Sequence, residues 1–235
     1  MTFAILVLAA GLGFVSLLGG AAVIDPSLAI LDEAESEISG LMLTSQLAMQ
    51  CTCVVLALWV AGFYASNRSE VLALGPVPGG SITHLRSFLL LIVVSGAFSA
   101  LAWHFARDDI IADLSQLWPL FESPYWWLLL ILAVIGAPLS EEIVFRGFLQ
   151  SALAQSPLGF WGAVLVTNTA WTALHAGYSW TGLLDVFVAG LVFSWLLWRT
   201  GSLWVPIICH GLYNGLIFAV LWAFDFSQFV PTPAG

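Results

Sequence analysis

Polar and ionisable side chains interrupt three otherwise apolar segments in the second half of the chain. A glutamate and an imidazole can together deprotonate a water molecule for attack on a carbonyl. A second imidazole and a carboxamide N–H can stabilise the oxyanion that develops. The set therefore predicts hydrolase chemistry, and its members are Glu141, His175, His210 and Asn214. Glu142, Arg146 and Asn168 are polar residues of the same segments.

The three charges in "APLSEEIVFRGFL" separate into a pair and a single carboxylate. Glu142 and Arg146 are four residues apart, so a helix places them on one face in the favourable order for an ion pair. Glu141 points about 100° away from that pair and needs another partner. It is the candidate base. The alternative is that all three charges lie at the membrane interface and extend into water.

Two further helices carry polar residues on a single face. Asn168, Trp171 and His175 lie at i, i+3 and i+7, and His210 and Asn214 are four apart. Polar groups in lipid face the interior of a helix bundle and bond to one another. We therefore expect these helices to converge on Glu141.

A water molecule is the expected nucleophile. Ser140 precedes Glu141 and Cys209 precedes His210, but neighbours on a helix point apart, so neither is paired with a base.

The composition predicts an all-α, polytopic transmembrane helical bundle. Of the 235 residues, 60% are hydrophobic and 8% are charged, whereas soluble domains have about 25% charged residues. A run of about 20 apolar residues suffices to cross the bilayer. About seven spans are expected, within a range of six to eight, at 2–24, 40–65, 87–106, 125–150, 158–176, 180–199 and 203–225.

We divide the chain into N-terminal transmembrane helices and connectors (1–124), a catalytic core (125–225) and a C-terminal tail (226–235). Four of the five Arg residues fall on or near one side of the predicted spans, so the positive-inside rule places the N-terminus in the cytoplasm.

A straight seven-span count places His175 too near the outer end of its span to meet Glu141. Either "GFLQSALAQ" forms a helix along the interface, or the chain turns at mid-membrane near Gly177.

Three ordered motifs resemble those of the type II CAAX prenyl endopeptidases and their bacterial relatives, the CPBP or Abi intramembrane proteases. The resemblance covers roughly 135–216. EExxxR is present as Glu141-Glu142-xxx-Arg146, and HxxxN as His210-xxx-Asn214. FxxxH is present with Trp171 in place of the phenylalanine, followed by His175.

The resemblance implies peptide-bond hydrolysis within a membrane, expected here to be the bacterial plasma membrane. Glu141 and His175 would activate water, His210 and Asn214 would form the oxyanion site, and Glu142 with Arg146 would support the first helix. No cofactor is expected. The alternative is zinc bound by Glu141, His175 and His210.

The expected partners are the lipid bilayer and a membrane-associated protein or peptide substrate, prenylated or not, and no nucleic acid is expected. The alternatives are a transporter or proton-coupled channel, or a non-catalytic immunity protein that binds a membrane partner. Repeat symmetry, common in transporters, is not evident.

Two features lie outside the motifs. Gly211 and Gly215 form a GxxxG pair that predicts close helix packing. Asp185 is an additional buried carboxylate, placed to orient a histidine or line the cavity.

Overall fold

The computed structural model describes residues 32–63, 67–226 and 229, and this part of the chain is helical without a strand. The prediction of an all-α bundle is confirmed. Two segments wind as π-helices, η2 and η3. The elements in order are α2 (Asp32–Ala61), α3 (Arg68–Val71), α4 (Ser81–Ser115), α5 (Trp118–Glu122), α6 (Trp126–Ile131), η2 (Leu132–Gly136), α7 (Ala137–Glu141), η3 (Glu142–Gln150), α8 (Ser151–Leu153), α9 (Gly159–Ala173), α10 (Trp180–Thr200) and α11 (Trp204–Ala223).

The protein is an integral membrane protein. Among the described residues, five stretches are long and apolar enough to cross a bilayer. Large apolar side chains such as Phe105 and Trp180 are exposed on its outer faces, where lipid can cover them. The five stretches are Ser39–Ala61, Ser81–Glu122, Trp126–Leu153, Trp180–Thr200 and Trp204–Ala223.

Two of the seven predicted spans differ from these five. The span predicted at 2–24 lies outside the described residues. The span predicted at 158–176 corresponds to α9, which has 15 residues. At 1.5 Å per residue it is about 22 Å long, whereas the hydrocarbon core is about 30 Å thick. α9 alone is therefore too short to span the membrane.

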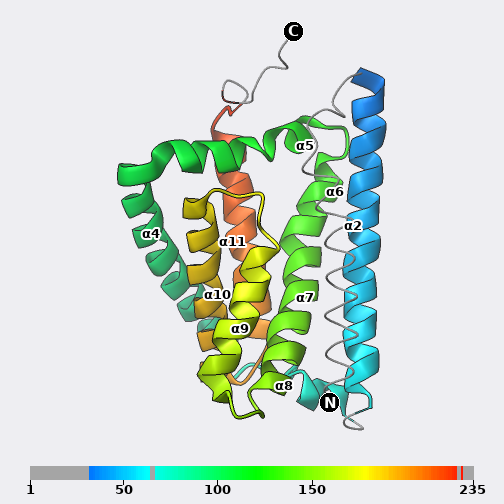
Figure 1. Cartoon of the computed structure of the whole chain (residues 1–235), viewed down its shortest axis with the longest axis vertical. Coiled ribbons are helices and arrows are strands. Elements are labelled where there is room, and N and C mark those ends of the chain that lie inside the picture. The colour runs from blue at the N-terminus through cyan, green and yellow to red at the C-terminus, as the bar shows by residue number, and fades with distance from the viewer. Residues whose placement is uncertain (1–31, 64–66, 227–228, 230–235) are drawn as a thin grey trace.

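The position at which α9 ends explains how His175 lies inside the bundle. The helix stops at Ala173, and residues 174–179 form a turn before α10 begins. Figure 1 shows this end of α9 midway along its neighbours. The alternative of an interfacial helix is wrong, because η3 and α8 continue the third candidate span to Leu153. The chain turns inside the bundle, beginning just before Gly177.

α10 and α11 stand between α4 and the α6–α8 column, and α2 runs along the other side of that column (Figure 1). α4 bends at Ala106, where φ is −146° and ψ is 40°. Its last part lies across one end of the bundle (Figure 1). There Asp113 accepts hydrogen bonds from the backbone N–H and hydroxyl of Ser179 at 2.8 and 2.7 Å. These bonds attach α4 to the start of α10.

Local sequence explains both ends of α10. The hydroxyl of Ser179 accepts a hydrogen bond from the N–H of Gly182 at 3.0 Å, as an N-cap does. Gly201 ends the helix with a positive φ of 66°, a conformation that glycine adopts without a steric penalty. The sequence "RTGS" is therefore a helix stop.

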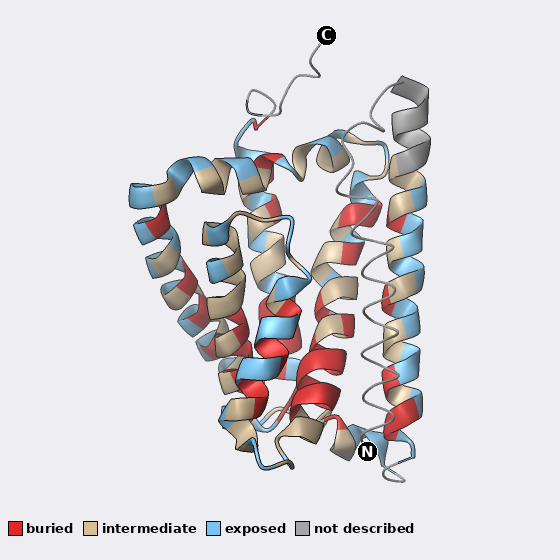
Figure 2. Ribbon diagram, viewed as in Figure 1, coloured by how far each residue is buried: buried red, intermediate tan, exposed pale blue. Residues whose placement is uncertain are grey.

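The larger hydrophobic core surrounds η3, where all nine residues are buried (Figure 2). Side chains from the C-terminal part of α2, from α10 and from the start of α11 pack around it. A smaller cluster includes Leu128, Leu132 and Phe218. The charged motif thus begins the most deeply packed segment that the structure describes.

Candidate active site

Glu142 and Arg146 form a buried ion pair. Nη1 of Arg146 lies 3.1 Å from Oε1 of Glu142, and the two side chains are 1% and 0% exposed. The predicted pair is confirmed, and the alternative of interfacial charges is wrong for these two residues. Nη2 of Arg146 also donates to Oδ1 of Asn168 at 3.2 Å and to the carbonyl of Gly190 at 3.4 Å. A buried charge requires such partners.

Gly190 allows this cluster to form. A Cβ atom at this position would overlap Oδ1 of Asn168 and would lie 2.7 Å from both Nη2 of Arg146 and the ring of Trp171. Sequence reasoning did not find this residue. An isolated glycine within an apolar helix was its only signal.

The two motif glutamates are separated by a change in helix type. Glu141 ends α7 and Glu142 begins η3. A π-helix has i→i+5 hydrogen bonds and commonly occurs at functional sites. The spacing argument for these residues used α-helical geometry, whereas the backbone winds as a π-helix from Glu142 onward.

His210 binds Glu142, not Glu141. Its Nδ1 lies 3.0 Å from Oε1 of Glu142, and the residue is 4% exposed. Its ring stacks on Phe193, with centroids 4.9 Å apart. The expectation that α11 converges on the motif is met, but through the glutamate that had been treated as structural. Because Nδ1 is engaged, Nε2 is the nitrogen that remains for a reacting group.

Glu141 is bound by the indole of Trp171. Nε1 of Trp171 donates to Oε2 of Glu141 at 2.6 Å. The sequence predicted that Glu141 needs a partner other than Arg146 but did not identify it, and Trp171 was interpreted only as an aromatic substitute for phenylalanine. The signal that it missed is the N–H group of tryptophan, which phenylalanine lacks.

His175 contacts the same tryptophan. Its Nδ1 lies 3.2 Å from the carbonyl oxygen of Trp171, and the two ring centroids are 5.2 Å apart. A carbonyl can only accept, so this hydrogen bond requires the proton on Nδ1. Nε2 of a neutral His175 is then free to accept a proton from water.

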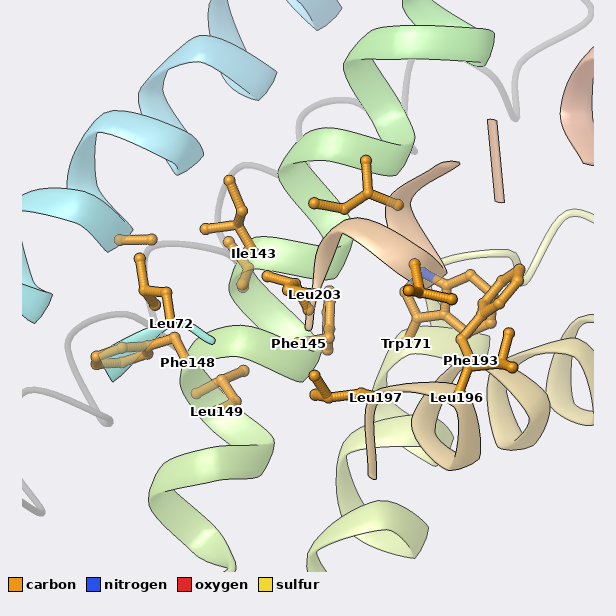
Figure 3. Close-up of a cluster of buried hydrophobic side chains, with 14 of the residues drawn as sticks. Leu72, Ile143, Phe145, Phe148, Leu149, Trp171, Phe193, Leu196, Leu197 and Leu203 are labelled. Carbon is orange, nitrogen blue, oxygen red and sulfur yellow. The ribbon is translucent and has the colours of Figure 1, made fainter. Parts of the chain in front are cut away.

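Trp171 lies at the centre of the cluster, 2% exposed. Its ring lies 4.1 Å from Cζ of Arg146 in a cation–π contact, and 5.7 Å from the ring of His210. Figure 3 shows it beside Phe193. The structure therefore brings Glu141, His175 and His210 around one aromatic residue.

Asn214 is bonded to the backbone of η2. Its Nδ2 donates to the carbonyl of Ala133 at 2.8 Å. A carboxamide nitrogen carries two hydrogens, so one remains for an oxyanion. Gly211 permits the close approach of α11, because a Cβ atom there would lie 2.5 Å from the carbonyl oxygen of Val134. The GxxxG pair thus faces η2.

Asp185 is not joined to a histidine. Its Oδ2 accepts a hydrogen bond from the hydroxyl of Tyr213 at 2.9 Å. The idea that it orients one of the site's imidazoles has no support in the hydrogen bonds of the described residues.

The arrangement of the carboxylates and imidazoles does not match a zinc site. Within 32–63, 67–226 and 229, no three His, Cys, Asp or Glu side chains are grouped to hold a metal ion. Two of the three residues in the alternative zinc set have other partners: Glu141 bonds to Trp171, and His210 bonds to Glu142.

Comparison with known proteins supports the resemblance seen in the motifs. Residues 123–216 match the family described as "Type II CAAX prenyl endopeptidase Rce1-like". The resemblance is confirmed for this part of the chain, which contains all three motifs.

Two curated relatives match shorter stretches. The first is "Putative membrane peptidase YdiL" of Bacillus subtilis (strain 168), 32% identical over 90 residues, which is 38% of this chain and 36% of that protein. The second is "Uncharacterized 24.3 kDa protein" of Escherichia coli, 32% identical over 85 residues, which is 35% of this chain and 39% of that protein. The match thus spans little more than a third of each relative. No solved structure matches the chain significantly.

Proposed function

We propose that this chain, whose residues 123–216 match the type II CAAX prenyl endopeptidase family, is an intramembrane endopeptidase. One observation carries the proposal: Glu141 and His175, from separate segments, both bond to Trp171, at 2.6 and 3.2 Å. A carboxylate and an imidazole are thereby held on one residue in a membrane protein. This is the pair that a water nucleophile needs.

In the proposed reaction, Glu141 and His175 accept a proton from a water molecule as its oxygen attacks the carbonyl carbon of the substrate. The C–O bond forms and the carbonyl π electrons move to its oxygen. When the tetrahedral intermediate collapses, the C–N bond breaks and the same pair returns the proton to the leaving amine. The products are a carboxylate and an amine, so water is the only co-reactant.

His210 and Asn214 are proposed to stabilise the oxyanion. The free Nε2 of His210 and the second amide hydrogen of Asn214 are the groups available for this role. An imidazole that donates from Nδ1 to Glu142 donates from Nε2 as well only in its doubly protonated form.

We propose that a substrate chain enters between α2 and the η2–α7 segment. A cavity of about 310 Å³ lies there, lined in part by Gln50, Ala133 and Ala137. Ala133 is the acceptor for Asn214, and Ala137 is one helical turn before Glu141. The cavity therefore lies beside the segment that carries the acceptor of Asn214 and leads to the proposed base.

The substrate is proposed to be a membrane-associated protein or peptide, prenylated or not, in the bacterial plasma membrane. We propose no cofactor and no nucleic-acid partner. The ends of α4, α8 and α10 that lie together in Figure 1 carry Arg86 and Arg199, whereas Arg107 follows the bend of α4 at the opposite end. This distribution supports a cytoplasmic location for the end with Arg86 and Arg199.

The test uses purified full-length protein in detergent, incubated with a prenylated C-terminal peptide and with a panel of single-span bacterial membrane proteins. Replacing Glu141 or His175 by alanine should lower kcat at least about a hundredfold. The matched controls are Glu122→Ala and His104→Ala, which remove exposed residues of the same types. Both controls should cleave like the wild type.

Cleavage that persists unchanged in Glu141→Ala and His175→Ala would overturn the assignment. Ion flux into liposomes carrying the protein, abolished by the same two substitutions while no substrate is cleaved, would favour the transporter alternative instead.

A further inference from the structure

We infer that Trp171 is a positioning residue for the proposed base Glu141, an inference that rests on the proposed endopeptidase function. The indole Nε1 donates to Oε2 of Glu141 at 2.6 Å, and Trp171 is 2% exposed. A short hydrogen bond from a buried N–H to a carboxylate is charge-assisted, and it is stronger and more directional than one between neutral groups.

The bond depends on a feature of this chain. At this position the FxxxH motif has a phenylalanine, whose ring carries no donor. Trp171 provides the aromatic ring and adds an N–H group. The indole thus connects α9 directly to the last residue of α7, a link that phenylalanine cannot make.

The direction of the N–H group is fixed by the packing of the ring. One face contacts the guanidinium of Arg146 at 4.1 Å, and Phe193 lies edge-on with its centroid 6.1 Å away. Arg146 is in turn bound to Glu142 at 3.1 Å. A rotation of the indole would disturb a buried ion pair, so the donor remains aimed at Glu141.

The two oxygens of the Glu141 carboxylate therefore have different roles: one accepts the indole hydrogen bond, and the other is available to accept a proton from water. Trp171 binds Oε2, which leaves Oε1 for the proposed water. The carbonyl oxygen of Trp171 lies 3.2 Å from Nδ1 of His175 and orients its ring. Nε2 of His175 is then available for the proposed water. Trp171 thereby sets the orientation of both groups that would activate water, without itself touching the reacting atoms.

The first experiment compares Trp171→Phe with Trp204→Phe in the cleavage assay. Trp204 is the matched control, because its Nε1 donates to the carbonyl of Leu74 at 3.1 Å. Trp171→Phe should lower kcat about tenfold with KM within about twofold, since only the alignment of the base changes. Trp204→Phe should leave both constants unchanged. Equal effects of the two substitutions, or a wild-type kcat in Trp171→Phe, would overturn the inference.

The second experiment needs no activity and so separates this inference from the proposed function. In ¹⁵N-indole NMR spectra of the protein in detergent, the Trp171 signal is identified by its absence from Trp171→Phe. If the indole binds the carboxylate, Glu141→Gln should shift this signal and leave the Trp204 signal in place. A Trp171 signal that Glu141→Gln does not move would disprove the bond, even if the protein is an active peptidase. A shift would support the bond whether or not the protein cleaves the substrates offered, so the two proposals are tested separately.

Discussion

Nδ1 of His210 lies 3.0 Å from Oε1 of Glu142, and the same oxygen accepts a hydrogen bond from Arg146 at 3.1 Å. Glu142 therefore joins η3 to α11 while it neutralises the arginine beside it. Its neighbour Glu141 makes its hydrogen bond to α9 instead. The two consecutive glutamates thus attach the motif to two different helices.

Glu142→Gln should reduce catalysis although Glu142 is not the proposed base. The amide keeps the shape of the side chain but removes the carboxylate charge that His210 and Arg146 both contact. We expect kcat to fall more than about tenfold, by analogy with the loss of a carboxylate that orients a catalytic imidazole. The measurement is kcat and KM beside the exposed control Glu70→Gln. An unchanged kcat in Glu142→Gln would contradict the role assigned to this contact.

Arg146→Ala should destabilise the fold strongly. The substitution leaves Glu142, which is 0% exposed, without its charged partner. Breaking a buried pair in this way costs about 3–5 kcal/mol. The measurement is the thermal unfolding of the protein in detergent. The control is Arg107→Ala, which breaks an ion pair with side chains 66% and 94% exposed, and should leave the unfolding temperature unchanged. Equal unfolding temperatures for the two variants would disprove the prediction.

Gly190→Ala should disturb the site through one added methyl group. The new Cβ atom would overlap Oδ1 of Asn168 and crowd Arg146. Overpacking of this kind costs about 1–3 kcal/mol. Gly96→Ala is the matched control, because a Cβ atom at Gly96 meets nothing within 4 Å. We expect a lower unfolding temperature and reduced cleavage for Gly190→Ala but not for Gly96→Ala. Equal unfolding temperatures of the two variants would contradict the prediction and show that the polar cluster shifts to make room.

Cleavage should survive the removal of metal ions. The proposed mechanism uses Glu141 and His175 to activate water, and their hydrogen bonds to Trp171 need no metal. Incubation with EDTA or 1,10-phenanthroline should leave kcat unchanged. Activity that is lost on chelation and restored by zinc would instead require Glu141, His175 and His210 to rearrange into a ligand set.

Five of the seven predicted apolar segments overlap helices of the described residues that are long and apolar enough to cross a bilayer. Hydrophobic runs predict spans because a helix in lipid satisfies its own backbone hydrogen bonds, a local property of the chain. α10, at Trp180–Thr200, differs by one residue from the predicted 180–199. The prediction was wrong for α9, because composition does not show that the helix ends at Ala173 inside the bundle.

The sequence predicted which residues form the candidate site more accurately than it predicted the contacts between them. Glu142 and Arg146 pair as their spacing indicated, since an i,i+4 contact is local. The partner of His210 and the donor to Glu141 were not predictable in the same way. These contacts join residues 68 and 30 positions apart in the sequence.

The sequence by itself determined the all-α membrane class, the buried ion pair of Glu142 with Arg146 and the identity of the polar residues that meet. Each follows from short-range physics: hydrophobic run length, helical spacing, and the cost of an unpaired polar group in lipid. Only the tertiary structure decided which glutamate binds which helix, and that Trp171 donates to Glu141. The physical reason is that a hydrogen bond needs its atoms about 3 Å apart in a defined direction. That geometry was set here by the π-helical turn at Glu142, the end of α9 and the close approach of α11 at Gly211.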